Sequence, residues 1–164
     1  LKIKDFRYNN LVFSDKIQKR NFYLNEFVPS SGSSLKEDVK NDLKWNYTRK
    51  LITLSPNKGF KILKVKTNTI DNFCKNNKVT KIDILKIDAE GSELEILKGS
   101  KKILHKTKII QVEILQNKKN FNKIKKKITI LLKKYNFHKT SEKNIYSVSL
   151  FSNLKSSDLL FIKL

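Results

Sequence analysis

The sequence predicts an α/β fold that contains a pair of parallel strands, and three consecutive segments in the middle of the chain support this prediction. Residues 81–87 (KIDILKI) and 108–115 (KIIQVEIL) are rich in Ile and Leu, as expected of buried strands. Residues 92–98 between them are predicted to form a helix. Two apolar strands joined through a helix make a β-α-β unit, which implies a right-handed crossover. The residues expected to be buried in the first strand are Ile82, Ile84, Leu85 and Ile87.

A long amphipathic helix is predicted over residues 118–135. Its apolar side chains recur at intervals of three and four residues, which places them on one helix face: Phe121, Ile124, Ile128, Leu131 and Tyr135. Further strands are expected at residues 137–141, 145–151 and 159–164. This order of elements predicts a sheet with helices on both faces, capped by antiparallel edge strands.

The first part of the chain is predicted to contain three strands and a short helix. Residues 8–14 and 21–27 are expected to form strands joined by a polar turn and to pair as a hairpin. Residues 59–66 alternate in polarity and predict a third strand. Thr69 is the expected N-cap of a helix over residues 70–77, because its side chain can accept a hydrogen bond from a free amide of the first turn.

Four shorter features complete the expected outline. Residues 28–34 (VPSSGSS) have the composition of a loop, and residues 35–48 are read either as a short helix or as a mobile flap. Gly99 suits the position that ends a helix, and Ser100 is expected to cap a further helical turn.

Composition limits the classes of function. The formal net charge of +21 suits binding to nucleic acid or to an anionic membrane. However, 33 of the 36 basic residues are Lys, whereas selection for phosphate binding favours Arg, so we attribute the charge to compositional bias. The single cysteine, Cys74, excludes an internal disulfide framework and fits a reducing, cytoplasmic compartment. No apolar run approaches the roughly 20 residues that span a bilayer, so no transmembrane segment is expected.

Carboxylates lie at the ends of both strands of the β-α-β unit. Asp88 and Glu90 follow the first strand, and Glu113 lies near the end of the second. Ligands of open α/β sheets bind beyond the carboxyl ends of the strands, and Gly91 allows a sharp turn into the following helix. These residues alone are compatible with metal binding, with recognition of a substrate hydroxyl, or with helix capping. Glu113 either contributes to such a site or anchors a neighbouring loop or basic side chain.

One stretch in the middle of the chain also matches a known pattern. Residues 67–104 (TNTIDNFCKNNKVTKIDILKIDAEGSELEILKGSKKIL), followed by KIIQVEI at residues 108–114, resemble the FkbM methyltransferase family. The family pattern is roughly T-L-D-x-F, then I-D-x-L-K-I-D-x-E-G-x-E-x-x-V-L-x-G, then I-x-x-E-I, and Ile70 stands here in place of the usual Leu. The segments LVFSDK at residues 11–16 and SGSSL at residues 31–35, and the C-terminal DLLFIKL, resemble the family more loosely.

The resemblance implies a Rossmann-like class I methyltransferase that transfers a methyl group from S-adenosylmethionine to a hydroxyl of a sugar, glycan or polyketide-like acceptor. Such an enzyme aligns the acceptor oxygen, the methyl carbon and the sulfonium sulfur. Asp88 and Glu90 are then the candidate catalytic residues, which would take or orient the proton of the acceptor. Glu113 is the candidate substrate-binding residue. Ser14 and Asp15 are the candidate cofactor-binding residues at the adenine, with an ordinary turn as the alternative; no metal site is assigned.

The sequence departs from the family in its glycines. The family binds its cofactor through an early turn of the form Asp-x-Gly-x-x-x-Gly, and none of the four glycines here has that spacing. We therefore expect residues 1–164 to be the C-terminal portion of a single methyltransferase domain, with an incomplete Rossmann-like sheet that lacks the first β-α-β-α units. Such a portion is expected to be inactive alone. The alternatives are a noncatalytic remnant and a basic module that binds RNA or anionic surfaces.

Overall fold

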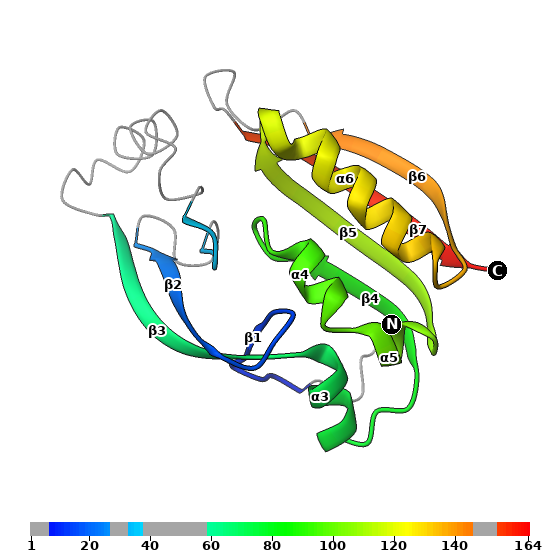
Figure 1. Ribbon diagram of the computed structural model, residues 1–164, viewed down its shortest axis with the longest axis horizontal. Helices are drawn as coiled ribbons and strands as arrows, with labels where there is room; N and C mark the ends of the chain where they lie inside the picture. Colours follow the sequence, from blue (N-terminus) through cyan, green and yellow to red (C-terminus); the bar gives the residue numbers. More distant parts are fainter. Residues whose placement is uncertain (1–6, 27–32, 38–58, 146–153) are drawn as a thin grey trace.

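The computed structural model describes residues 7–26, 33–37, 59–145 and 154–164, which form two sheets and their covering helices (Figure 1). The elements are β1 (Val12–Phe13), β2 (Lys19–Asn25), β3 (Phe60–Asn68), α3 (Ile70–Asn76), β4 (Ile82–Asp88), α4 (Glu93–Lys98), α5 (Lys101–Leu104), β5 (Thr107–Asn117), α6 (Lys118–Lys133), β6 (Phe137–Ile145) and β7 (Leu154–Lys163). The predictions for residues 28–32, 38–48 and 146–151 lie outside the described residues. None of the helices in the described part combines the length and the hydrophobicity that a bilayer crossing requires.

The larger sheet has the strand order β4-β5-β7-β6. Strands β4 and β5 are parallel, with Ile87 opposite Val112, and α4 and α5 connect them, so the predicted β-α-β unit is confirmed. Strand β7 inserts between β5 and β6 and is antiparallel to both. The fold class is therefore α/β with a mixed sheet, and β7 is longer than the predicted strand at residues 159–164.

Helix α6 packs along one face of this sheet, as the predicted apolar stripe requires. Of the predicted stripe, Phe121 and Ile128 are buried, and the other three residues are partly buried against the core. Leu132, which was not part of the predicted stripe, is also buried. The side chain of Asn117 caps the helix by accepting a hydrogen bond from the amide of Asn120 at 2.9 Å. The helix then ends before Asn136, whose φ of 63° starts the turn into β6.

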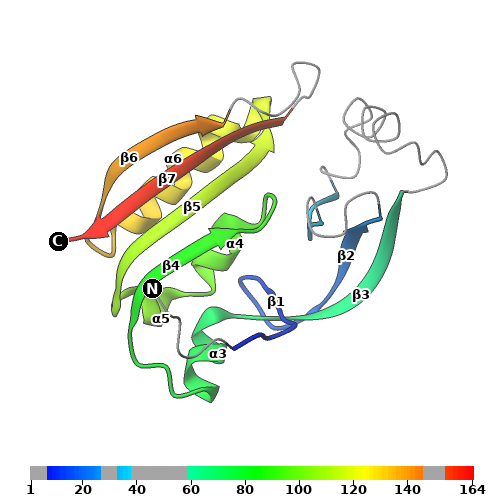
Figure 2. The ribbon, with the colours of Figure 1, turned by 180° about the vertical axis from the view of Figure 1, so that it is seen from behind.

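The expectation of helices on both faces of the sheet is wrong for the described residues. Helices α4 and α6 both lie on the face seen in Figure 1, whereas the view from behind shows the strands uncovered (Figure 2). The prediction that Ile84 is buried is wrong for the same reason, because its side chain points to the uncovered face and is 65% exposed. Strand β4 is also an edge strand in the described structure, so only one of its sides carries a hydrogen-bonded neighbour.

The smaller sheet has the order β1-β3-β2 and lies on the β4 side of the larger sheet (Figure 1). The predicted hairpin between residues 8–14 and 21–27 is wrong, because β3 lies between the two strands. Strand β1 pairs with β3 in the parallel sense, and β2 pairs with β3 in the antiparallel sense over seven residue pairs. The hydroxyl of Thr67 on β3 donates to the carbonyls of Lys16 and Gln18, which holds the intervening turn against β3.

Close contacts at the end of α4 join the two sheets. The backbone of Gly99 lies so near the carbonyl of Ser14 that a β-carbon at position 99 would overlap its oxygen. Gly99 ends α4, as predicted, with a φ of −83°, which any residue can adopt, so the close approach to Ser14 explains why a glycine stands here. The expected side-chain cap by Ser100 is wrong, because its hydroxyl donates to the carbonyl of Ile96 instead.

Helix α3 begins as predicted, and its Asp71 links it to α5. The hydroxyl of Thr69 accepts a hydrogen bond from the amide of Asn72 at 3.1 Å. The carboxylate of Asp71 accepts hydrogen bonds from the backbone amides of Lys102 and Ile103 at 2.9–3.0 Å. It thereby satisfies the free amides at the start of α5, which no residue of α5 satisfies itself.

Candidate functional site

Three carboxylates lie side by side on adjacent strands of the larger sheet. Asp88 on β4 is opposite Glu113 on β5, and Glu113 is opposite Asp158 on β7. Residues directly opposite on neighbouring strands project to the same face, so the three form a row, which we call the acid row. It lies on the uncovered face, near the carboxyl ends of β4 and β5, where ligands of open α/β sheets bind.

The charges of the acid row are only partly compensated. The Nζ of Lys86 donates to Asp88 at 3.3 Å, and the hydroxyl of Ser156 donates to Glu113 at 3.2 Å. Burial, together with the charges of Asp88 and Asp158, raises the pKa of Glu113 above its ordinary value. Asp158 has one buried oxygen with no hydrogen-bond partner among the described residues. The row can therefore hold a proton or accept hydrogen bonds from a ligand hydroxyl.

A hollow of about 640 Å³ separates the smaller sheet from β4 and α4, and we call it the central hollow. Its walls are mainly apolar and include Val12, Phe13, Phe22, Leu24, Leu63, Val65, Leu85 and Ile87. Its polar lining consists of Asn10, Ser33, Ser34, Lys86, Asp88 and Ser92. Of the predicted site residues, only Asp88 lines this hollow, so Asp88 is where the acid row meets it.

The chain turns from β4 into α4 over residues 88–91, which we call the acid turn. Glu90 and Gly91 have positive φ angles of 47° and 99°. The hydroxyl of Ser34 donates to the carbonyl of Glu90 at 2.6 Å, and the side-chain amide of Gln116 donates to the carbonyl of Gly91 at 3.0 Å. The loop before α4 is thus held from the smaller sheet's side and from β5, and Gly91 occupies the left-handed position that the sequence predicts for a sharp turn.

Ser14 and Asp15 lie apart from the acid row. Ser14 is fully buried, and its hydroxyl donates to Asp15 and Glu95 and accepts from the guanidinium of Arg20, each at 3.2 Å. Glu95 also forms ion pairs with Arg20, at 2.6 Å, and with Lys36. We call these groups the Glu95 cluster. It joins β1, β2 and the segment after Ser34 to α4, and the structure does not bring Ser14 or Asp15 together with Asp88.

The comparison with known proteins gives one match. A family model described as the methyltransferase FkbM domain matches residues 4–139, which is most of the chain. The chain belongs to the FkbM methyltransferase family. Methyl transfer is therefore the general chemistry that this membership indicates. No curated protein and no solved structure matches the chain.

The described residues of this FkbM-family chain fit S-adenosylmethionine, the methyl donor that methyltransferases generally use, only in part. S-adenosylmethionine needs room for its adenine, a carboxylate environment for its cation and a close backbone approach at its polar end. The central hollow offers apolar walls and Asp88. Of the glycines in the described residues, Gly91 belongs to the acid turn and Gly99 packs on Ser14, while a β-carbon at Gly59 would meet nothing within 4 Å, so none of the three forms a cradle in the hollow.

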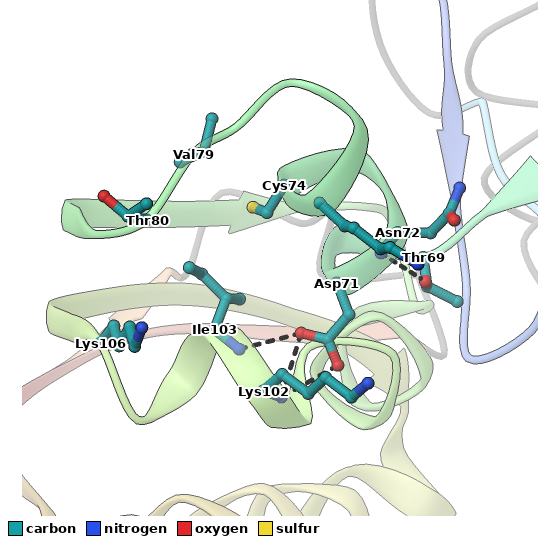
Figure 3. Close-up of a pocket in the computed structure, with 10 residues that line it drawn as sticks. Thr69, Asp71, Asn72, Cys74, Val79, Thr80, Lys102, Ile103 and Lys106 are labelled. Atoms are coloured by element: carbon teal, nitrogen blue, oxygen red, sulfur yellow. Dashed lines mark hydrogen bonds between the residues drawn. The ribbon is translucent and has the colours of Figure 1, made fainter.

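A second hollow, of about 590 Å³, lies between α3 and α5, next to the hydrogen bonds that hold these two helices together (Figure 3). Figure 3 shows the hydrogen bonds of Asp71 to α5 along one of its sides. Cys74 also lines it, and burial, with the charge of Asp71, raises the pKa of its thiol. A raised pKa disfavours the thiolate, so this cysteine is not an activated nucleophile. Among the described residues, no group of three or more His, Cys, Asp or Glu side chains is arranged to hold a metal ion.

Two residues in or beside the candidate site were not predicted from the sequence. Asp158 begins the C-terminal segment DLLFIKL, but only the pairing of β7 with β5 places it beside Glu113. Glu93 is fully buried directly after the acid turn, and its carboxylate accepts the amide of Gly91. The repeat of Glu at positions 90, 93 and 95 was the available signal, because a buried strand-to-helix turn leaves little room for three solvated carboxylates.

Proposed function

We propose that this chain is the C-terminal portion of a Rossmann-like class I methyltransferase domain, and that the longer enzyme methylates a hydroxyl of a sugar, glycan or polyketide-like acceptor with S-adenosylmethionine. The observation that carries the proposal is the meeting of the acid row with the central hollow at Asp88, in a chain of the FkbM family. Among the described residues no strand pairs with the outer side of β4, and this supports the proposal that the sheet is incomplete. A further parallel strand beside β4 would pair its free backbone groups and fill part of the hollow.

The role proposed for Asp88 follows from its position. Its side chain is 45% exposed, and it lines the central hollow. Its one ion pair among the described residues, with Lys86, is long at 3.3 Å. It is therefore accessible to an acceptor hydroxyl, whose proton it can accept or orient. Glu90, on the same turn, is proposed as the second catalytic carboxylate. The cofactor supplies the methyl group when bound, and the protein aligns the acceptor oxygen with it.

Glu113 is proposed to bind the acceptor through the acid row. Its raised pKa favours a protonated carboxyl more than in an ordinary glutamate, and a protonated carboxyl can donate a hydrogen bond to an acceptor oxygen. The adenine contacts of Ser14 and Asp15 stay predictions. Because the hydroxyl of Ser14 is already engaged in the Glu95 cluster, Asp15 is the better placed of the two to accept a further hydrogen bond.

Calorimetry with S-adenosylhomocysteine tests the cofactor proposal. The 164-residue chain is compared with the same chain extended by any in-frame coding sequence upstream. We expect binding by the extended protein and none by the 164 residues alone. Tight binding by the 164 residues, or an upstream sequence with no open frame, would overturn the proposal that another segment completes the site.

Substitution of Asp88 tests the proposed chemistry. In the extended protein, Asp88→Asn is expected to lower the methyl-transfer rate by a factor of about 100 or more, because a general base contributes on that order. The unfolding midpoint should hardly change, since the side chain is half exposed. Asp83→Asn is the matched control on the same strand, because Asp83 lies on the surface and pairs with Lys108. Equal rates for both variants would remove Asp88 from the mechanism.

One observation favours a second function, the basic binding module. Helix α6 contains no acidic residue, and most of its lysines are exposed: Lys118, Lys119, Lys123, Lys126, Lys127 and Lys133. RNA or anionic vesicles would then bind with an affinity that falls steeply with salt. Binding that survives at about 0.2 M salt, and is lost when Lys123, Lys126 and Lys127 are changed to Gln, would favour this module over the enzyme.

A further inference from the structure

The backbone of the acid turn is in a conformation that needs support. Glu90 has a φ of 47°, in the left-handed region, where the β-carbon of any residue other than glycine lies too close to the following carbonyl oxygen. Such conformations persist where the surrounding structure determines them, and they are frequent at functional sites. The support here comes from three side chains on three parts of the fold.

Two of these side chains bind carbonyls and cannot ionise. Ser34 donates to the carbonyl of Glu90, and Gln116 donates to the carbonyl of Gly91. The third, Glu93, binds an amide: its Oε1 accepts the N–H of Gly91 at 2.7 Å. Glu93 is fully buried, and its Oε2 has no hydrogen-bond partner among the described residues.

The ionisation of Glu93 is finely balanced by its surroundings. Burial raises the pKa of Glu93 to about 7, the charge of Glu90 adds to this effect, and the backbone amides of Ala89, Gly91 and Glu93 itself oppose it. No cation among the described residues contributes to the pKa of Glu93. Arg20 of β2 and Lys36 pair with Glu95, and the ion pair of Lys125 on α6 is with Glu142, so Glu90 is the charged group that acts on Glu93.

We propose that Glu93 is the positioning residue of the acid turn, and that its carboxylate holds the left-handed backbone that presents Asp88 and Glu90. A carboxylate is a stronger acceptor for the Gly91 amide than a carboxylic acid. Proton uptake by Glu93 therefore weakens this hydrogen bond and loosens the turn as the pH falls through neutrality. The consequence for methyl transfer rests on the proposed function, whereas the hold on the turn does not.

The amide signal of Gly91 reports this hydrogen bond directly. The chain has four glycines, and Gly91 is the one that follows a glutamate. Labelling the full chain with ¹⁵N-glycine and ¹³C′-glutamate therefore identifies the Gly91 amide in an NMR spectrum without full assignment. Its chemical shift is expected to titrate with a midpoint at about pH 7, while the amides of Gly59 and Gly99 stay constant over the same range.

Two variants make the result decisive. Glu93→Gln keeps an oxygen that can accept the Gly91 amide but removes the proton equilibrium, so the Gly91 signal should lose its titration and stay close to its high-pH position. Glu90→Gln removes the neighbouring charge, so the midpoint should fall while the titration persists. The proposal is overturned if the Gly91 signal does not titrate in the wild type, or if its titration survives in Glu93→Gln. Should Glu93→Gln fail to fold, the wild type and Glu90→Gln still decide between these outcomes.

This experiment needs neither cofactor nor acceptor. A failure of the proposed enzyme function would appear as absent S-adenosylhomocysteine binding with the Gly91 titration intact. A failure of the positioning role would appear as a silent Gly91 amide in a protein that still binds S-adenosylhomocysteine.

Discussion

The acid row and the Glu95 cluster use the same side-chain chemistry to opposite effect. In the Glu95 cluster, burial raises the pKa of Glu95, but hydrogen bonds and charges from Lys36 and Arg20 outweigh it, so the pKa is lowered overall. In the acid row, burial raises the pKa of Glu113, and the charges of Asp88 and Asp158 raise it further. Glu95 is compensated by two cations and joins the smaller sheet to α4, whereas Glu113 is compensated only in part, by Ser156 and Lys86, and stays available to a ligand.

This difference separates a structural carboxylate from a candidate functional one. A buried charge costs free energy unless partners compensate for it, so an uncompensated group persists only where another requirement retains it. The acid row adjoins the central hollow at Asp88, and the Glu95 cluster does not line it. Variants that act on each region in turn can therefore confirm or contradict the distinction.

The largest effect is expected where the Glu95 cluster meets the end of α4. Gly99→Ala places a β-carbon onto the carbonyl oxygen of Ser14, a backbone atom that cannot rotate away. Overpacking of this kind should lower the free energy of unfolding by about 3 kcal/mol. Urea denaturation measures it, with Gly59→Ala as the control because nothing lies within 4 Å of that position. Similar midpoints for the two variants would show that the joint between the sheets is looser than these contacts indicate.

A smaller loss of stability is expected when Glu95 itself is substituted. Glu95→Gln leaves Arg20 and Lys36 without their carboxylate and should lower the free energy of unfolding by about 2 kcal/mol at pH 7. This loss is smaller than that expected for a fully buried ion pair, because the side chain of Glu95 is 23% exposed. Since the pKa of Glu95 is lowered, its stabilisation is present above the ordinary value of 4.5 and is lost as the pH falls through the lowered value. The difference between wild type and variant in urea denaturation should therefore stay nearly constant from pH 7 to about pH 4.5 and shrink as the pH falls further. A difference that stays undiminished at about pH 2 would mean that packing, not charge, explains the loss.

The same Glu-to-Gln substitution in the acid row should change the free energy of unfolding in the opposite direction. Glu113→Gln removes repulsion from Asp88 and Asp158 and should raise the free energy of unfolding at pH 7 by about 0.5 kcal/mol. Because the pKa of Glu113 is raised, the wild type loses stability as the pH rises from 4.5 to that raised value, so the gain should shrink toward about pH 4. Destabilisation by Glu113→Gln at neutral pH would place Glu113 with Glu95, as a structural carboxylate.

Much of the fold follows from local sequence patterns. The β4-α4-β5 unit, the apolar stripe of α6 and the cap at Thr69 each depend on residues close in sequence, and all were predicted. The hairpin between residues 8–14 and 21–27 was wrong because its two strands prefer a third, β3, which lies more than thirty residues later in the chain. The prediction that Ile84 is buried was wrong because apolar content does not tell which face of a strand is covered by helices.

Some features of the candidate site likewise follow from the local sequence, whereas others depend on the tertiary structure. Asp88, Glu90 and Glu113 stand out in the sequence because they follow apolar strands, and this is a local signal. The neighbour of Glu113 on its other side is Asp158, and that depends on β7 entering the sheet between β5 and β6. The buried state of Glu93 and the ion pairs of Glu95 likewise depend on side chains that other elements bring close.

Helix and strand periodicities are short-range properties. The local sequence therefore specifies the helices and strands, and it shows which strands end in carboxylates. Which carboxylates meet, and whether a cation reaches them, depends on strand order and on packing between segments far apart in sequence. Burial and partners set a pKa, and both exist only once those segments have packed. The tertiary structure alone therefore separates Glu95, which pairs with two cations, from Glu113, whose two neighbouring carboxylates are only partly compensated.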